Sequence, residues 1–279
     1  MPGKKRLGAS PHLYCEPAIV GLKADEGFEL TVDAQTRNAV KLRQRDLDAA
    51  FLSPIDYARE SSEYTIVPGV AVSSDKATQT VVLHFREGIQ NVRTMAVDPS
   101  SASEIILAKI LLEEQFDTAA TIIPVHGPLQ LMLQRADSAL LVGDPSLQEA
   151  GGNQNQIDLV EAWNDLTELP YVHGFWCSRE GDLTRSHAHK LQDALQQGLT
   201  MFDEMARTAR EHHTLHQSPE FIKTYLESFS FELVGEVEKG LREFIRYAYY
   251  HGVLADIADL NYYSLDSENS DSDATISLN

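Results

Sequence analysis

Short apolar runs alternate with stretches of helical apolar spacing along most of this chain. The runs have the length of buried strands, and the stretches between them repeat apolar residues as amphipathic helices do. Strands are expected at 28–34, 47–53, 64–69, 92–97, 120–125, 138–144 and 171–178, with two extended runs between 69 and 85. Helices are expected at 36–45, 54–60, 103–116, 129–135 and 157–169. This alternation predicts an α/β fold, with a parallel or mixed sheet covered by helices on both faces.

The pattern changes after Arg179, where the chain becomes almost wholly helical. Helices are expected at about 184–210, from 219 and from 237. Residues 266–279 are polar and acidic and have no apolar period, so we expect a disordered acidic tail there.

A turn between a strand and a helix, Asp98 to Ser103, is rich in hydroxyl groups. The free N–H groups at the start of a helix attract anions, and serine side chains add further donors. Serines also cap helices, and on this segment alone capping is the simpler interpretation. Ser53 and Gly143-Asp144 also follow predicted strands. Ligands bind beyond the carboxyl ends of such strands, so these residues together predict a site at one edge.

Composition narrows the choice of ligand. The formal net charge is -19, which argues against nucleic acid as a partner but leaves room for a small anion bound by local N–H groups. The N-terminal segment is basic without an apolar core, and no apolar run is long enough to span a bilayer. Two cysteines are too few for a disulfide framework. We therefore expect a cytoplasmic protein with no membrane partner.

Several segments resemble one enzyme family. They are LDAAFLSPIDYARESSEYTIVPGVAVSSD, MAVDPSSAS, DSALLVGD, IDLVEAWNDLTELPYVHGFWCSR and FELVGEVEKGLREFIRYAYYHGVL, and together they cover the chain from about Leu13 to Tyr263. In order and spacing they resemble the menaquinone-biosynthesis enzymes of the futalosine pathway, and most of all the chorismate dehydratases.

The resemblance implies a two-lobed, periplasmic-binding-protein-like (type II) fold with a helical C-terminal part. The chain would cross between lobes near Ser74 to Thr80 and near Trp176 to Arg179. The first lobe would comprise 1–76 and 178–265, and the second 77–177. The implied reaction is the loss of water from chorismate to give 3-[(1-carboxyvinyl)oxy]benzoate, with the substrate's own side-chain carboxylate as base. No metal and no cofactor are implied.

The resemblance also assigns site residues. Tyr14 and Thr80 would be catalytic, and the substrate would contact the residues Ser53, Ser100, Ser101, Ser103 and Asp144. Tyr14 stands where the family usually has Asn, and Thr80 where it has Ser. Ala102-Ser103-Glu104 replaces an Arg-Thr-Ser pattern, so a carboxylate would compete with a bound anion.

Other interpretations remain open. His212 and His216 are four positions apart on a predicted helix, but without a supporting motif we expect exposed histidines rather than a metal site. Arg37 is expected on a solvated helix face. A non-catalytic binding protein for a small carboxylate is the main alternative function, favoured by Tyr14 and Glu104. A secreted transport receptor and the sister reaction on a futalosine derivative are further alternatives.

Overall fold

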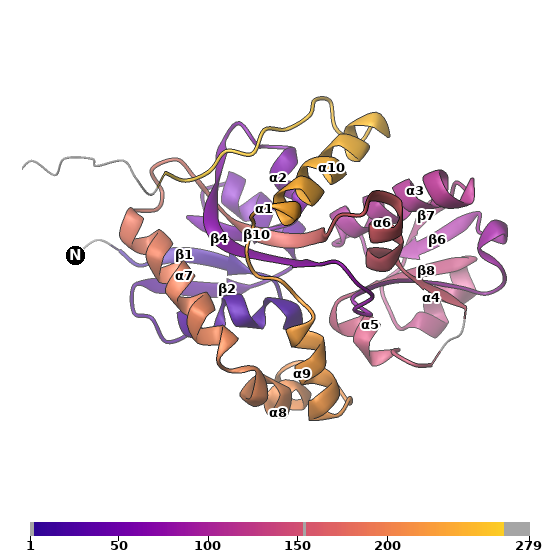
Figure 1. Ribbon diagram of the computed structural model, residues 1–279, viewed down its shortest axis with the longest axis horizontal. Helices are drawn as coiled ribbons and strands as arrows, with labels where there is room; N and C mark the ends of the chain where they lie inside the picture. Colours follow the sequence, from indigo (N-terminus) through magenta and orange to yellow (C-terminus); the bar gives the residue numbers. More distant parts are fainter. Residues whose placement is uncertain (1–2, 153–154, 265–279) are drawn as a thin grey trace, which may run out of the picture.

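The computed structural model describes residues 3–152 and 155–264; the expected tail at 266–279 lies outside the described residues. Two five-stranded sheets each form the centre of a lobe (Figure 1). The strands are β1 (Lys5–Ala9), β2 (Phe28–Val32), β3 (Ala49–Leu52), β4 (Tyr64–Ser74), β5 (Val81–Phe85), β6 (Thr94–Val97), β7 (Thr121–Pro124), β8 (Ser138–Val142), β9 (Gln156–Asp158) and β10 (Tyr171–Arg179). The prediction of a two-lobed α/β fold is confirmed.

Helices cover both sheets. They are α1 (Gln35–Arg43), α2 (Pro54–Ala58), α3 (Ala102–Phe116), α4 (Leu129–Arg135), α5 (Asp144–Gln148), α6 (Leu159–Thr167), α7 (Arg185–Leu199), α8 (Phe202–His212), α9 (Pro219–Glu227) and α10 (Glu236–Tyr250). Short 3₁₀ segments are η1 (Leu13–Ala18), η2 (Val20–Leu22) and η3 (Ile89–Asn91). None of the helices in the described ranges is long and apolar enough to cross a membrane.

Both sheets are mixed. The first has the order β2-β1-β3-β10-β4, in which β1 runs parallel to β2 and β3, and β10 runs antiparallel to β3 and β4. The second has the order β7-β6-β8-β5-β9, with β6 parallel to its neighbours and β5 antiparallel to β8 and β9. In each sheet the strands that connect the lobes are the antiparallel ones.

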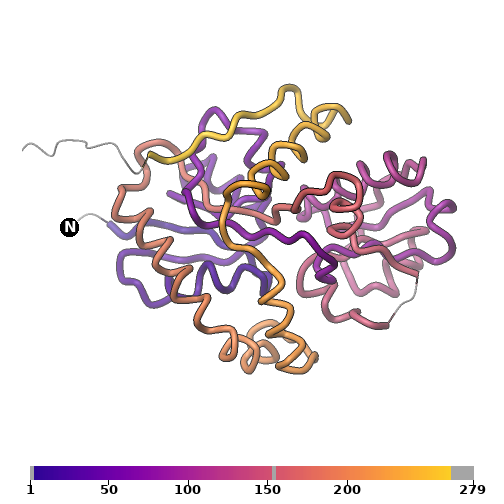
Figure 2. The backbone as a smooth tube through the Cα atoms, viewed as in Figure 1, coloured from indigo at the N-terminus to yellow at the C-terminus, as the bar shows by residue number. Residues whose placement is uncertain are grey.

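The chain crosses between the lobes twice (Figure 2). The first crossing joins β4 to β5, where it was expected. The second lies between α6 and β10, around Pro170, and not near Trp176 to Arg179 as expected. Cys177 pairs with Ala50 of β3, so the whole of β10 belongs to the first sheet and the second lobe ends before Tyr171. The sequence of a buried apolar strand does not indicate which sheet the strand joins, and this explains the difference.

The lobes are packed against each other. One apolar cluster contains buried residues of both lobes, and Trp163 of α6 meets Phe244 of α10 with ring centroids 5.8 Å apart. The segment after α9 crosses the connection between lobes, where Ser230 and Ser73 exchange backbone hydrogen bonds (Figure 2). The structure is therefore a closed form, in which residues between the lobes are removed from solvent.

The helix expected at 184–210 is two helices, because α7 ends at Leu199 and α8 begins at Phe202. Gly198, in the last turn of α7, lies against η1 so closely that a Cβ there would stand 2.0 Å from the carbonyl oxygen of Pro17. The break lets α7 pack on η1 and lets α8 turn to pack on α9.

Candidate active site

A cluster of four polar side chains is buried where the lobes meet. Tyr14 comes from η1, Glu104 from the first turn of α3, and Tyr171 and His173 from β10; we call these four residues the interlobe cluster. Their exposed fractions lie between 0 and 2%. The rings of Tyr14 and Tyr171 flank His173, with centroid distances of 5.3 and 5.1 Å. Glu104 belongs to the second lobe and the other three to the first, so the cluster forms only when the lobes close.

Each member of the interlobe cluster has a polar atom that finds no hydrogen-bond partner among the residues that the structure describes. These atoms are Tyr14 OH, Glu104 Oε1, Tyr171 OH and His173 Nδ1. Tyr14 lies near Ser10, and Tyr171 near Glu104, but neither pair has the geometry of a hydrogen bond. Because buried polar groups in proteins are almost always paired, four unpaired atoms in one place indicate a site that a polar ligand completes.

Burial dominates the electrostatics of Glu104. Removal from water raises the pKa of its carboxyl to about 7, and the charge of Asp56 adds to this effect. Its own backbone N–H and the Tyr171 hydroxyl act to lower the pKa of the Glu104 carboxyl, but their effect is smaller. Near neutral pH this carboxyl is therefore divided between its acid and carboxylate forms.

The other members of the cluster remain neutral. Burial lowers the pKa of His173 to about 3, and its Nε2 lies 2.8 Å from the Oγ of Ser74. Burial, and then the charge of Glu104, raise the pKa of the Tyr14 and Tyr171 phenols well above the usual value. The phenols can donate hydrogen bonds but cannot readily give up a proton.

The start of α3 is less open than the sequence suggested. Ser103 Oγ donates to Ser53 Oγ at 2.9 Å and accepts from the backbone N–H of Ile55 at 2.9 Å. Ser53 is the N-cap of α2 and donates to Asp56 Oδ2 at 2.8 Å. The carboxyl of Glu104 lies at the same helix end, where its own backbone N–H acts to lower its pKa. The expected seat for an anion is thus occupied by the chain's own carboxyl and by serines that join the lobes.

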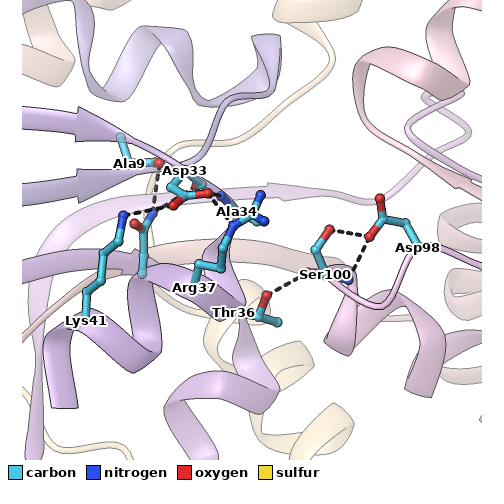
Figure 3. A network of polar contacts seen from close by, with 9 residues as sticks. Ala9, Asp33, Ala34, Thr36, Arg37, Lys41, Asp98 and Ser100 are labelled. Atoms are coloured by element: carbon cyan, nitrogen blue, oxygen red, sulfur yellow. Dashed lines mark hydrogen bonds and ion pairs between the residues drawn. The ribbon is translucent and has the colours of Figure 1, made fainter. Parts of the chain in front are cut away.

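Ser100 and Ser101 lie at the edge of this contact. The Oγ of Ser100 donates to Asp98 at 2.7 Å, and Ser101 is the N-cap of α3 but makes no capping bond with its side chain. Figure 3 shows Thr36 of α1 directed at the carbonyl oxygen of Ser100, at 3.4 Å. The hydroxyl of Ser100 is thus engaged within its own turn.

Figure 3 also shows Arg37 and Lys41 converging on Asp33 on the surface of the first lobe. The side chain of Arg37 is 69% exposed, as expected for a solvated helix position.

Thr80 is fully buried at the first crossing. Its hydroxyl accepts from Thr78 at 2.7 Å and donates to Tyr225 at 3.2 Å. Tyr225 packs against Phe229, which in turn packs against Tyr14, so Thr80 lies behind the interlobe cluster rather than within it.

Asp144 joins the lobes. From the start of α5 its carboxylate accepts from the backbone N–H of Leu13 at 2.8 Å and lies 2.8 Å from His213 Nδ1. The preceding Gly143 has φ +67°, and a Cβ there would stand 2.2 Å from the ring of His12. Only glycine allows this close approach of the two lobes.

A groove of about 620 Å³ opens beside the interlobe cluster, at the crossings. Its lining includes Ser74, Pro170 and Phe229. Ser74 bonds to His173, and the ring of Phe229 packs on both Tyr14 and His173. Phe229 is therefore the wall between the groove and the cluster.

Tyr171 and His173 were not among the site residues predicted from the sequence. A signal was present, because residues two apart on a strand share a face and YVHGF places a phenol and an imidazole on the same one. Within the described ranges, no group of three or more His, Cys, Asp or Glu side chains could hold a metal ion. Cys15 and Cys177 are buried with raised thiol pKa values, so neither is an activated nucleophile.

Comparison with solved structures shows the same fold in proteins of low sequence identity. Protein AF1704 from Archaeoglobus fulgidus has a TM-score of 0.72 at 17% identity, covering 90% of this chain and 98% of its own. The periplasmic aliphatic sulphonate binding protein SsuA from Escherichia coli has a TM-score of 0.64 at 14% identity, covering 93% of this chain and 96% of its own.

Comparison of sequences is more specific. A chorismate dehydratase from Thermus thermophilus is 23% identical over 237 residues, which cover 78% of this chain and 86% of the relative. The sequence profile of a family described as menaquinone biosynthesis matches residues 5–250, which include both lobes and the whole interlobe cluster. The chain therefore belongs to the menaquinone-biosynthesis family.

Proposed function

We propose that this protein is a hydro-lyase that removes water from chorismate to give 3-[(1-carboxyvinyl)oxy]benzoate. Membership of the menaquinone-biosynthesis family and similarity to a chorismate dehydratase support the reaction. The observation that carries the proposal is the interlobe cluster, with its four unpaired polar atoms. Chorismate presents two carboxylates and a ring hydroxyl, which such atoms would bind.

In this proposal the lobes open, admit chorismate and close over it. Closure excludes water and fixes the leaving hydroxyl relative to the ring proton, so that much of the catalysis comes from positioning. Tyr14 touches the substrate through its hydroxyl. Ser53 and Ser103, which bond to each other in the closed form, exchange that bond for one to the substrate.

The remaining predicted residues act at a distance. Thr80 supports the cluster through Tyr225, and Asp144 holds the lobes closed. Ser100 and Ser101 contact the substrate only if the turn before α3 moves on opening. We place the activity in the cytoplasm, with no nucleic acid and no membrane as partner.

The test is direct. Purified protein is incubated with chorismate and the mixture is separated by chromatography, with boiled protein as control. We expect the enolpyruvyl benzoate to accumulate in proportion to protein and time. Absence of this product at micromolar protein would contradict the proposal.

One observation favours a second function. Tyr14 and Glu104 depart from the pattern of the chorismate dehydratases where the lobes meet, which favours a binding protein of the same fold that holds a small carboxylate without chemistry. Under this alternative, chorismate or a related acid raises the melting temperature but no product forms.

A further inference from the structure

The carboxyl of the interlobe cluster has a placement that ordinary helix capping does not explain. Glu104 is 2% exposed at the start of α3, and its Oε1 lacks a partner among the described residues. The titratable groups that face it are Tyr14 from η1, Asp56 from α2 and Tyr171 from β10. No basic side chain is among them, so the carboxyl is held in place by packing and not by an ion pair.

The neighbouring carboxyl, that of Asp56, is hydrogen-bonded within its own helix. Its carboxylate accepts a hydrogen bond from the hydroxyl of Ser53, and its backbone N–H donates to the same hydroxyl, which caps α2. Glu104 alone presents a free oxygen toward the phenols of Tyr14 and Tyr171. It is the carboxyl that a ligand between the lobes would meet.

We propose that Glu104 is the general acid that protonates the departing hydroxyl of chorismate, an assignment that rests on the function proposed above. A buried carboxyl with a free oxygen can donate a hydrogen bond to a hydroxyl, whereas it would repel a carboxylate. The residue therefore selects which end of the substrate lies at the start of α3: the ring hydroxyl, and not either acid group.

The charge state fits this role. Burial raises the pKa of Glu104 to about 7, so a large fraction holds its proton at neutral pH. The other members of the cluster are unsuited to proton transfer, because the pKa of His173 is lowered to about 3 and that of Tyr14 is raised well above its usual value. The base for the ring proton is then a carboxylate of the substrate itself.

The step balances without a further reactant. The C–H bond of the ring carbon that bears the ether oxygen breaks, its electron pair forms the new ring double bond, and the C–O bond to the hydroxyl on the neighbouring ring carbon breaks. The substrate's side-chain carboxylate takes the ring proton, while Glu104 gives its proton to the departing hydroxyl and water leaves. The side-chain acid then returns a proton to Glu104, and the sum is loss of one water.

The experiment measures kcat and KM for chorismate from pH 5.5 to 9 in three proteins: wild type, Glu104→Gln and Glu161→Gln. Glu161 is an exposed acid of the neighbouring α6 and serves as the matched control. We expect wild-type kcat to fall tenfold per pH unit above about 7, as the acid loses its proton. Glu104→Gln should lower kcat at pH 6.5 by about 10²- to 10⁴-fold with KM changed less than about threefold, and should abolish this pH dependence.

Several outcomes would overturn the assignment. One is a Glu104→Gln protein with kcat within about threefold of wild type, or one impaired in KM alone. Another is a Glu104→Ser protein more active than wild type, which would show that the carboxyl only obstructs an anion seat. If Glu104→Gln does not fold, Glu104→Asp should keep the pH dependence at reduced kcat. A wild type without product contradicts the proposed function itself, which separates that failure from a failure of the acid assignment.

Discussion

The buried hydroxyl of Tyr14 lowers the stability of the fold, and in the proposed function it binds the substrate. This hydroxyl is fully buried and has no hydrogen-bond partner within the described part of the chain, and an unpaired buried hydroxyl costs roughly 1–3 kcal/mol. Nothing in the fold requires the hydroxyl, because the ring alone packs against His173 and Phe229. The same holds for Glu104, whose ionised form is opposed by burial.

Tyr14→Phe separates these roles. Because the unpaired hydroxyl is removed and the ring is kept, we expect the free energy of unfolding to stay the same or rise by about 1 kcal/mol. Turnover of chorismate should fall at least about tenfold, since a hydrogen bond to the substrate is lost. Urea unfolding and the chromatographic assay measure the two effects. A loss of stability with unchanged turnover would assign the hydroxyl to the fold.

Glu104 also predicts how stability depends on pH. Its carboxyl pKa is raised from 4.5 to about 7 by folding, so between these values the folded protein keeps a proton that the unfolded chain has lost. Stability from this group is therefore complete below about 4.5 and declines as pH rises through about 7, by about 3 kcal/mol in all.

Glu104→Gln removes this dependence. We expect the variant to be more stable than wild type at pH 8 by up to about 3 kcal/mol, with the difference shrinking toward pH 5. Denaturant unfolding at both pH values measures this. Equal pH dependence in the two proteins would mean that Glu104 is not buried as described.

At the scale of elements, the junction between β8 and α5 controls how the lobes meet. Gly143 has a left-handed backbone conformation and the ring of His12 lies against it, which brings Asp144 to the N–H of Leu13. The positive φ of Gly143 and its contact with His12 both require glycine at this position.

Gly143→Ala tests the junction, with Gly151→Ala as the control. Gly151 also has a positive φ, +82°, but a Cβ there would meet no atom within 4 Å. The control should cost about 1 kcal/mol in backbone strain. Gly143→Ala should cost at least about 2 kcal/mol more, because His12 must move. Equal losses in urea unfolding would show that the close approach does not matter.

The sequence predicted most elements because their apolar patterns are local. It missed β1, whose five residues KRLGA include two cations and a glycine, yet β1 lies between β2 and β3 in the first sheet. Its place depends on partners distant in sequence. For the same reason the second crossing was expected near Trp176 but lies around Pro170, since strand pairing is a tertiary property.

The candidate site was predictable only in part. Tyr14, Ser53 and Ser103 were named and lie where the lobes meet, and Glu104 was noted as a departure. The sequence could not show that Ser103 would bond to Ser53, or that Glu104 would face Tyr171, because both contacts depend on how far the lobes close.

For the whole molecule, closure is the central property. Besides Asp144, His251 after α10 joins the lobes, with its two ring nitrogens each 2.9 Å from a carboxylate, of Glu113 and Glu114 in α3. Both contacts lie outside the interlobe cluster. They hold the lobes together without touching the groups that we assign to the substrate.

Asp144→Ala combined with His251→Ala should open the molecule. We expect a larger radius of gyration in small-angle X-ray scattering without substrate, and a return toward the wild-type value when chorismate is added. Lys223→Ala is the control, because it removes an exposed ion pair with Asp203 inside the first lobe. An unchanged radius in the double variant would mean that apolar packing alone holds the lobes closed.

The position of the ligand is the most direct test. Glu104→Gln crystallised with chorismate should show the ring between Tyr14 and the glutamine that replaces Glu104, with the ring hydroxyl at the start of α3. Chorismate bound instead in the groove beside Phe229, or in no ordered position between the lobes, would contradict the account.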